Sequence, residues 1–233
     1  MDTQFLILVF LLISLGACNQ ESQPSYQSNS DTTRAKGQIP DFSSINTSDV
    51  YVYNCADSLQ LTAHVTTDST WLFLSDTTVK LGHVPAASGA KYQSPDYLYW
   101  SKNGQALFQG PTSSLMNCTA ISKEKSWQAA KLRGVNFRAL GQEPGWILEI
   151  TKGAQMQYIG NYGQDTVVTP VPNPRVDKQK GITTYNALTH AHSMTIKIID
   201  EPCTDSMSGF EFSSTVTVTV DGKTYRGCGR TLN

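Results

Sequence analysis

The sequence predicts an all-β protein made of two small antiparallel β-barrel or β-sandwich domains, each with one disulfide, joined by a short helical connector. Short apolar runs typical of strands recur throughout residues 50–233 and are separated by turn residues. No segment of that range has the apolar periodicity of a long amphipathic helix. Four of the five cysteines form two pairs that are close in sequence, which gives each predicted domain its own bridge.

The first predicted domain, residues 50–118, consists of short strands and turns. Asn103-Gly104 is a strong signal for a type I′ hairpin, because both residues tolerate a positive φ. This hairpin would place Lys102 at an exposed turn. The strand candidates are Leu59–Leu61, Trp71–Leu74, Tyr97–Trp100 and Gln105–Gln109.

The second predicted domain, residues 134–233, repeats the β pattern after a connector at residues 119–133. The connector contains Ser122–Leu132, which has helix formers and no helix breakers. Asp221-Gly222 follows an alternating apolar run and is the strongest hairpin signal in the sequence. Val168–Lys180 contains three prolines and is expected to be a loop. The strand candidates are Trp146–Thr151, Met194–Ile199, Val216–Val220 and Lys223–Arg226.

Residues 1–18 have the features of a lipoprotein signal peptide. Phe5–Leu15 is an apolar run of eleven residues, which is too short to span a bilayer and fits a secretory signal. Leu15-Gly16-Ala17-Cys18 resembles the lipobox of bacterial lipoproteins, in which the cysteine is lipidated and becomes the mature N-terminus. The start lacks the usual Lys or Arg, and the alternative is an ordinary cleaved signal that ends near Ala17.

The segment after Cys18 predicts how the protein is held at the bacterial envelope. Asn19 rather than Asp follows the cysteine, which by the sorting rule of enterobacterial lipoproteins indicates the outer membrane, facing the periplasm. Residues 19–49 are rich in Ser, Gln, Asn, Thr and Asp, so we expect a disordered tether there. Such a chain spans roughly 30 Å and would hold a folded head away from the membrane.

An odd number of cysteines in a secreted protein requires an explanation, and Cys18 as a lipid anchor provides one. Of the three pairings open to the other four, only Cys55–Cys118 with Cys203–Cys228 keeps each bridge within one domain. Free thiols are the alternative, which an oxidising envelope disfavours. No two cysteines have the spacing of a zinc site.

The formal net charge is −1, and no segment carries a strong excess of either sign. Residues 1–49 hold five acids and two bases (−3), residues 50–118 hold four and three (−1), and residues 119–233 hold ten and thirteen (+3). None of these values is large enough to indicate a nucleic-acid partner or strong attraction to a membrane surface.

Candidate catalytic and metal-binding residues have weak support in the sequence. Ser88 as a hydrolase nucleophile lacks the G-x-S-x-G motif and a surrounding strand-to-helix turn. His190 and His192 lack a third metal ligand, and Asp205–Gly209 lacks the spacing and closing Glu of a calcium loop. We therefore expect no enzyme activity, no catalytic residue, no metal and no cofactor.

From physical properties alone, Pro85–Phe108 is a loop and hairpin with an ordinary surface serine and lysine. A resemblance favours a different interpretation. Over about seventy residues the chain has Tyr51–Cys55, Ala87–Tyr92, Trp100–Lys102, Ala106 and Cys118 in an order and spacing that resemble those of the membrane-bound inhibitors of c-type lysozyme. That family typically has Gly directly after its lysine and then acidic residues, whereas Asn103, Gly104 and Gln105 follow Lys102 here.

This resemblance implies a small antiparallel barrel closed by a disulfide and an inhibitor whose partner is c-type lysozyme. It assigns contact with lysozyme to Ser88, Gly89, Ala90, Tyr92 and Lys102. A loop with small side chains could enter the lysozyme cleft, where Ser88 would hydrogen-bond one catalytic carboxyl group and Lys102 would bind its partner.

Residues 134–233 resemble an uncharacterised domain of bacterial envelope lipoproteins, and this resemblance implies no activity. An alternative function follows from this half of the chain: an envelope ligand-binding module whose C-terminal β-barrel holds a small apolar molecule or a glycan. The residues that carry the resemblance are Phe137–Ala139, Glu143–Trp146, Cys203–Gly209 and Tyr225–Arg230.

Overall fold

The computed structural model describes residues 42–232. The expected signal peptide and the lipobox cysteine, Cys18, lie outside the described residues. Residues 42–232 belong to one compact unit, so the boundaries of the two domains stay a prediction. No helix in this part of the chain is long and apolar enough to cross a membrane.

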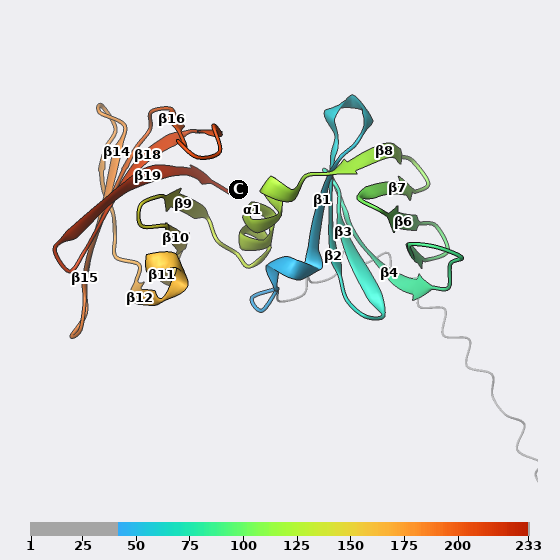
Figure 1. The fold of residues 1–233 in the computed structure, drawn as a ribbon, viewed down its shortest axis with the longest axis horizontal. Coiled ribbons are helices and arrows are strands. Elements are labelled where there is room, and N and C mark those ends of the chain that lie inside the picture. The colour runs from blue at the N-terminus through green and yellow to red at the C-terminus, as the bar shows by residue number, and fades with distance from the viewer. Residues whose placement is uncertain (1–41, 233) are drawn as a thin grey trace, which may run out of the picture. The chain divides into compact units, whose positions relative to one another are not determined.

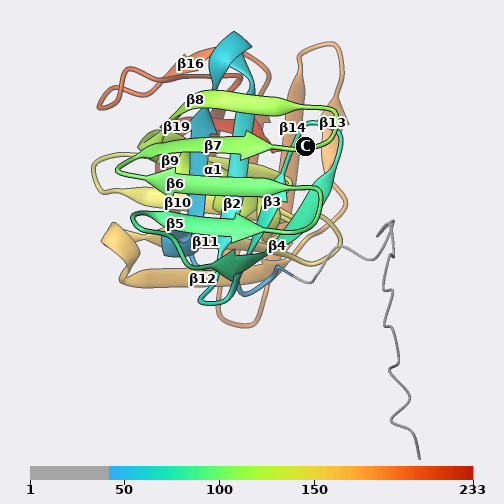
Figure 2. The same ribbon diagram turned by 90° about the vertical axis from the view of Figure 1, so that its right-hand side faces the viewer.

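The first half of the described chain is a closed barrel of eight antiparallel strands, each paired with the next in sequence (Figures 1 and 2). The last strand returns to pair with the first, so the barrel leaves no free sheet edge. The strands are β1 (Val50–Asn54), β2 (Gln60–Val65), β3 (Ser69–Phe73), β4 (Thr78–Val84), β5 (Ala90–Gln93), β6 (Leu98–Lys102), β7 (Gln105–Gln109) and β8 (Ser114–Ala120).

The seam between β1 and β8 is the shortest pairing of the barrel. Only Tyr53 with Ala120 and Asn54 with Thr119 pair across it. The disulfide Cys55–Cys118 joins the residue directly after β1 to β8, which confirms the predicted bridge and fastens the seam. Inside the barrel, alternate residues form a core that includes Leu61, Leu72, Leu81, Tyr99 and Phe108.

The predicted hairpin between β6 and β7 is confirmed. Asn103 and Gly104 have φ angles of 50° and 75°, the left-handed values that a type I′ turn requires. Lys102 pairs with Gln105 at the ends of the two strands, so Lys102 stands at the tip as expected.

The folded part of the chain begins earlier than the sequence predicted. Phe42 and Ile45 are buried against Val50 and Val52, and the ring of Phe42 meets Trp71 edge-on at 6.0 Å. A short 3-10 helix, η1 (Thr47–Asp49), leads into β1, and a second, η2 (Ala56–Ser58), follows it. Residues 42–49 are therefore part of the fold, and the expected tether is restricted to residues 19–41, outside the described range.

The connector forms the predicted helix, α1 (Ser122–Leu132), and two of its faces are buried. Ala129 packs with Val50 and Val52 of the barrel. Trp127 packs with Phe212, and two guanidinium groups lie over its ring, that of Arg138 at 5.3 Å and that of Arg230 at 4.7 Å from the ring centre. The helix is thus a packed element in which apolar burial and cation–π contacts act together.

The second half of the described chain is a curled antiparallel sheet of nine strands in the order β12-β11-β10-β9-β19-β18-β15-β14-β13 (Figure 1). A two-stranded sheet, β16 (Cys203–Thr204) with β17 (Glu211–Phe212), and a 3-10 turn, η3 (Asn161–Gly163), complete it. The nine strands are β9 (Phe137–Gly141), β10 (Trp146–Thr151), β11 (Gln155–Gly160), β12 (Asp165–Pro170), β13 (Arg175–Asp177), β14 (Ile182–Leu188), β15 (Ser193–Ile199), β18 (Ser214–Val220) and β19 (Lys223–Thr231).

One face of this sheet carries the core of the second half. Along β18 the valines are buried and the threonines between them are partly exposed, which is the period of two that the sequence predicted. Asp221 and Gly222, with φ angles of 49° and 81°, form the predicted turn into β19. The bridge Cys203–Cys228 is also as predicted. The buried residues include Leu148, Met156, Met194, Ile196, Val216 and Val218.

The prediction of a loop over Val168–Lys180 was wrong in part, because only residues 171–174 and 178–180 lie outside strands. The strand β12 continues to Pro170, which pairs with Gln155, and β13 follows at Arg175–Asp177. Both are the outermost strands of the nine. Proline cannot donate a ladder hydrogen bond, but an edge strand needs none on its outer side, so the prolines do not prevent pairing here.

Candidate functional site

The loop between β4 and β5, residues 85–89, is exposed and closely packed against β6 at its end. Gly89 has a φ of 72°, and a Cβ there would strike the carbonyl oxygen of Ser101 and lie 3.0 Å from both Lys102 Cβ and Trp100 Nε1. Only glycine combines this φ with this approach of one backbone to another.

Two contacts tie the loop to β6. The indole Nε1 of Trp100 donates to the carbonyl oxygen of Ser88 at 2.9 Å. The ammonium of Lys102 donates to the Ser88 hydroxyl at 3.2 Å. Within residues 42–232, no carboxylate forms an ion pair with Lys102. The structure therefore brings the serine and the lysine together and leaves both exposed.

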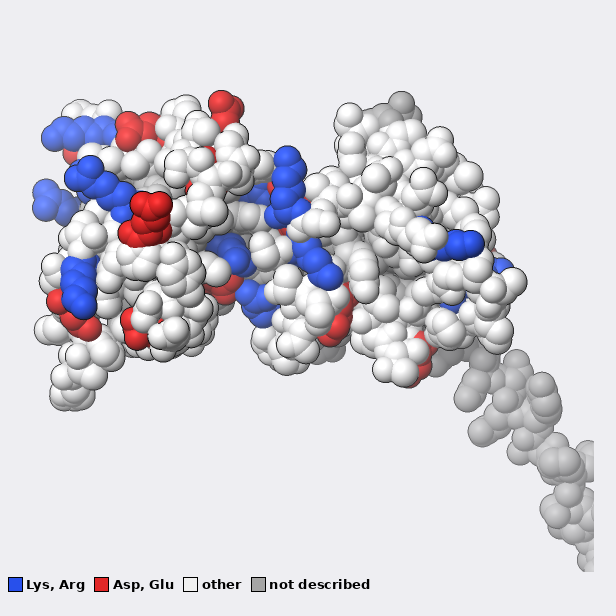
Figure 3. Space-filling view, viewed as in Figure 1, with Lys and Arg blue, Asp and Glu red and all other residues white. Residues whose placement is uncertain are grey.

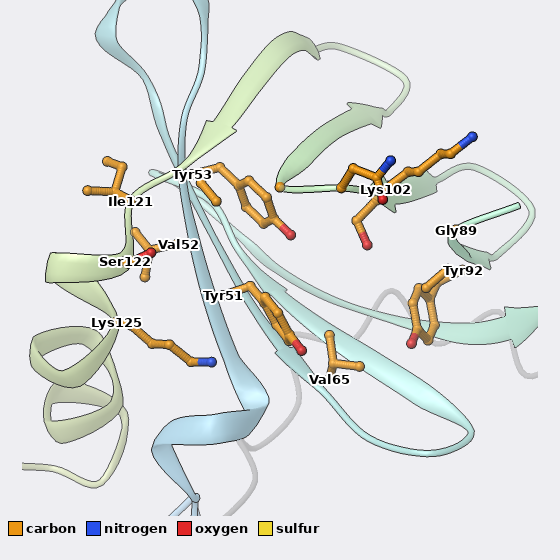
Figure 4. A pocket seen from close by; sticks show the side chains of 15 residues that line it. Tyr51, Val52, Tyr53, Val65, Gly89, Tyr92, Lys102, Ile121, Ser122 and Lys125 are labelled. Carbon is orange, nitrogen blue, oxygen red and sulfur yellow. The ribbon is translucent and has the colours of Figure 1, made fainter.

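A cavity of about 470 Å³ opens at the mouth of the barrel, directly beside this loop (Figure 4). Gly89, Tyr92 and Lys102 border it on one side (Figure 4), and Ala90 is also among its lining residues. These are four of the five residues that the resemblance assigned to contact with lysozyme. The fifth, Ser88, precedes Gly89 in the same loop.

Three tyrosines line the cavity, namely Tyr51, Tyr53 and Tyr92. The hydroxyl of Tyr99 donates to that of Tyr53 at 3.1 Å, and the rings of Tyr92 and Tyr99 stack with centroids 5.9 Å apart. Burial raises the pKa of Tyr53, of Tyr92 and of Tyr99. Tyr53 and Tyr92, which line the cavity, therefore remain uncharged at physiological pH and add no negative charge to it, while Tyr99 lies beneath them in the core.

Comparison with known proteins identifies a family for part of the barrel. Residues 53–116 match the family model described as membrane-bound lysozyme-inhibitor of c-type lysozyme. The resemblance of the first domain is confirmed. The matched family implies inhibition of lysozyme by a membrane-bound protein, which fits a protein of the cell envelope that is not an enzyme. No curated protein and no solved structure matched the chain.

Part of the cavity comes from outside the region that matches the inhibitor family. Lys125 of α1 lies on the wall that faces Lys102, and Ile121 and Ser122 flank it (Figure 4). Its ammonium is 4.6 Å from the ring of Tyr51 and donates to the carbonyl oxygen of Ser48 at 2.8 Å. Sequence reasoning missed Lys125, because its position depends on how the chain turns back after β8, which no local motif reveals.

The other candidate residues lie in hydrogen-bonded surroundings. The Ser88 hydroxyl is bound by an ammonium, and no base among residues 42–232 hydrogen-bonds to it. His192 pairs with Asp221 at 2.8 Å, and no group of three potential metal ligands occurs in the described part of the chain. Asp205 accepts two hydrogen bonds from Ser208 and forms a turn, as expected.

Proposed function

We propose that the protein is an envelope lipoprotein that inhibits c-type lysozyme by inserting the Ser88–Gly89 loop and Lys102 into the active-site cleft. The match of residues 53–116 to the inhibitor family supports the inhibition and the membrane location. The observation that carries the mode of binding is the 3.2 Å contact between Lys102 Nζ and Ser88 Oγ on an exposed tip.

The chemistry of the target suits this pair. Lysozyme works with two carboxyl groups, one kept protonated as the acid and one ionised, and in retaining glycosidases the two are about 5 Å apart. The hydroxyl of Ser88 can bind one carboxyl group while the ammonium of Lys102 makes a charge-assisted bond to the ionised one. Sugar is then excluded, and the inhibitor itself performs no chemical step.

Preorganisation favours binding by this loop. The Trp100 indole and the compact turn at Gly89 hold the loop in one conformation before the partner arrives. A side chain that is already ordered loses less conformational entropy on binding. The neighbours Ala87 and Gly89 add little width, so the loop stays narrow enough for a cleft.

Long-range attraction contributes little to this proposal. Residues 50–118 carry −1, and charged side chains are sparse on the barrel surface seen in Figure 3. Affinity would then come from contacts in the cleft rather than from steering, and the association rate would change little with salt.

Membrane attachment completes the proposal. Lipidation of Cys18 and a tether over residues 19–41 would place the barrel near the outer membrane, facing the periplasm. There it would meet lysozyme that has crossed the outer membrane. The family description, which names a membrane-bound inhibitor, supports attachment, and the sequence around Cys18 supports the type of anchor.

The function is tested by adding purified protein, from Gln20 onward, to bacterial cells that are lysed by a c-type lysozyme. Protection that rises with dose is expected. No protection at micromolar protein would remove the proposal.

A further inference from the structure

A partner that receives the Ser88 loop must also cover the cavity beside it. Gly89, Ala90, Tyr92 and Lys102 belong to the proposed contact surface and border the cavity at the same time. Protein interfaces are packed about as densely as protein interiors at their centre. A partner that packs densely here would fill part of this hollow of about 470 Å³.

The walls of the cavity define what that part can be. Two lysines, Lys102 and Lys125, line it, and no acidic residue is among the lining residues. The other lining residues are uncharged and include three tyrosines and apolar side chains such as Val52 and Val65. Asp49 borders an adjoining hollow, which shares Tyr51 and Val65 with this one. A carboxylate on a short apolar stem complements such a surface.

Lys125 is available to bind that carboxylate. One of the three N–H donors of its ammonium is used by Ser48, and the Tyr51 ring lies beneath it. Lys102 is already assigned to a catalytic carboxyl group of the target. Covering the ammonium of Lys125 without an anion would be costly, because a buried charge needs a partner.

We propose that this cavity is a second contact site for lysozyme, that it takes an Asp or Glu side chain from the border of the active-site cleft, and that Lys125 binds that carboxylate. This inference rests on the proposed function. Lys125 lies outside the matched residues 53–116, so it adds a determinant that the family match does not supply. A lysozyme with Lys or Arg at the corresponding place should bind less tightly, through repulsion.

The test measures the dissociation constant of the mature protein for a purified c-type lysozyme, at several salt concentrations. Lys125→Met keeps the apolar stem and removes the charge. Lys131→Met is the matched control, because it makes the same charge change on an exposed position of α1 that does not line the cavity. We expect Lys125→Met to weaken binding by about tenfold or more and to reduce the salt dependence, and Lys131→Met to do neither.

Lys125→Arg is the control for a loss of affinity that comes only from disturbed structure, because it keeps the cation and should retain most of the affinity.

A double-mutant cycle then identifies the partner group: acidic residues bordering the lysozyme cleft are changed one at a time to the amide. One of them should abolish the effect of Lys125→Met. If wild type binds and Lys125→Met binds equally well, this inference is wrong and the proposed function stands. If wild type does not bind lysozyme, both fail.

Discussion

The ammonium of Lys102 and the hydroxyl of Ser88 are 3.2 Å apart, although the two residues are separated by fourteen positions in the sequence. One stands at the tip of the β6–β7 hairpin, and the other lies in the loop before β5. Their meeting depends on Gly89, which lets the loop lie directly against the backbone of Ser101. The same geometry predicts which substitutions will damage the site.

Gly89→Ala should lower both stability and inhibition. The new Cβ would require an unfavourable φ and would strike the Ser101 carbonyl oxygen, so the loop must move away from Lys102. Gly153→Ala is the matched control, because Gly153 has a similar φ of 76° but no atom within 4 Å of the new Cβ. Thermal melts should show a loss of roughly 1–2 kcal/mol for the control and a larger loss for Gly89→Ala. Equal losses would mean that the close approach at Gly89 is unimportant.

A bulky residue that tests entry into the cleft must therefore be placed elsewhere. Ala87 is exposed in the same loop, and Ala87→Trp should leave the thermal melt close to wild type while reducing inhibition sharply. The measurement is residual lysozyme activity at increasing inhibitor concentration. Full inhibition by Ala87→Trp would show that the loop does not enter a narrow cleft.

Each disulfide should contribute several kcal/mol to stability. The two bridges close loops with sequence separations of 63 and 25 residues, which correspond to about 4 and about 3.5 kcal/mol in the chain-entropy account. Replacing both Cys55 and Cys118 with Ala should also loosen the short β1–β8 seam. Chemical denaturation of the two double variants checks this expectation. Unchanged midpoints would show that the bridges are dispensable.

Trp127→Ala should destabilise the whole described unit by roughly 3–5 kcal/mol, because it removes a buried aromatic side chain. Arg138 and Arg230 would lose their contacts with the ring, and α1 would lose its packing against Phe212. Gln128→Ala, a partly exposed neighbour on the same helix, is the control and should change stability little. A variant that unfolds like wild type would mean that α1 is a passive linker.

The anchor can be tested separately from inhibition. Cys18→Ala should release the protein from membranes or block its processing, because the lipidated group would be missing. Cell fractionation and labelling with a radioactive fatty acid measure this directly. Unchanged membrane association together with unchanged labelling would contradict lipidation at Cys18.

The hairpin turns could be predicted from the sequence, whereas the order of the strands in the sheet could not. Asn103-Gly104 and Asp221-Gly222 predicted their hairpins because the required positive φ is a property of those residues themselves. The strand that ends at Pro170 was missed, because a proline is acceptable only where the strand is outermost, and strand order is a property of the whole sheet.

For the candidate site too, some residues could be predicted from the sequence, while their contacts could not. Ser88 and Lys102 were predicted from a motif with fixed spacing, while their direct contact and the role of Trp100 emerged only from the structure. Lys125 gave no signal, because a lysine in a short helix is ordinary unless the fold brings that helix to the barrel mouth. Phe42 was assigned to the tether for a related reason: a single aromatic residue in a polar segment does not predict what it packs against.

The most direct measurement compares inhibition of a c-type lysozyme by wild type, Ser88→Ala and Lys102→Ala, with thermal melts of all three. Ser88→Ala should cost roughly 1–3 kcal/mol of binding free energy by leaving a carboxyl group without its partner. Lys102→Ala should cost roughly 2–5 kcal/mol by removing a charge-assisted bond. Both positions are exposed, so both variants should melt within about 0.5 kcal/mol of wild type. Inhibition at wild-type strength by two normally folded variants would contradict the account, because Ser88 and Lys102 would then not occupy the lysozyme cleft.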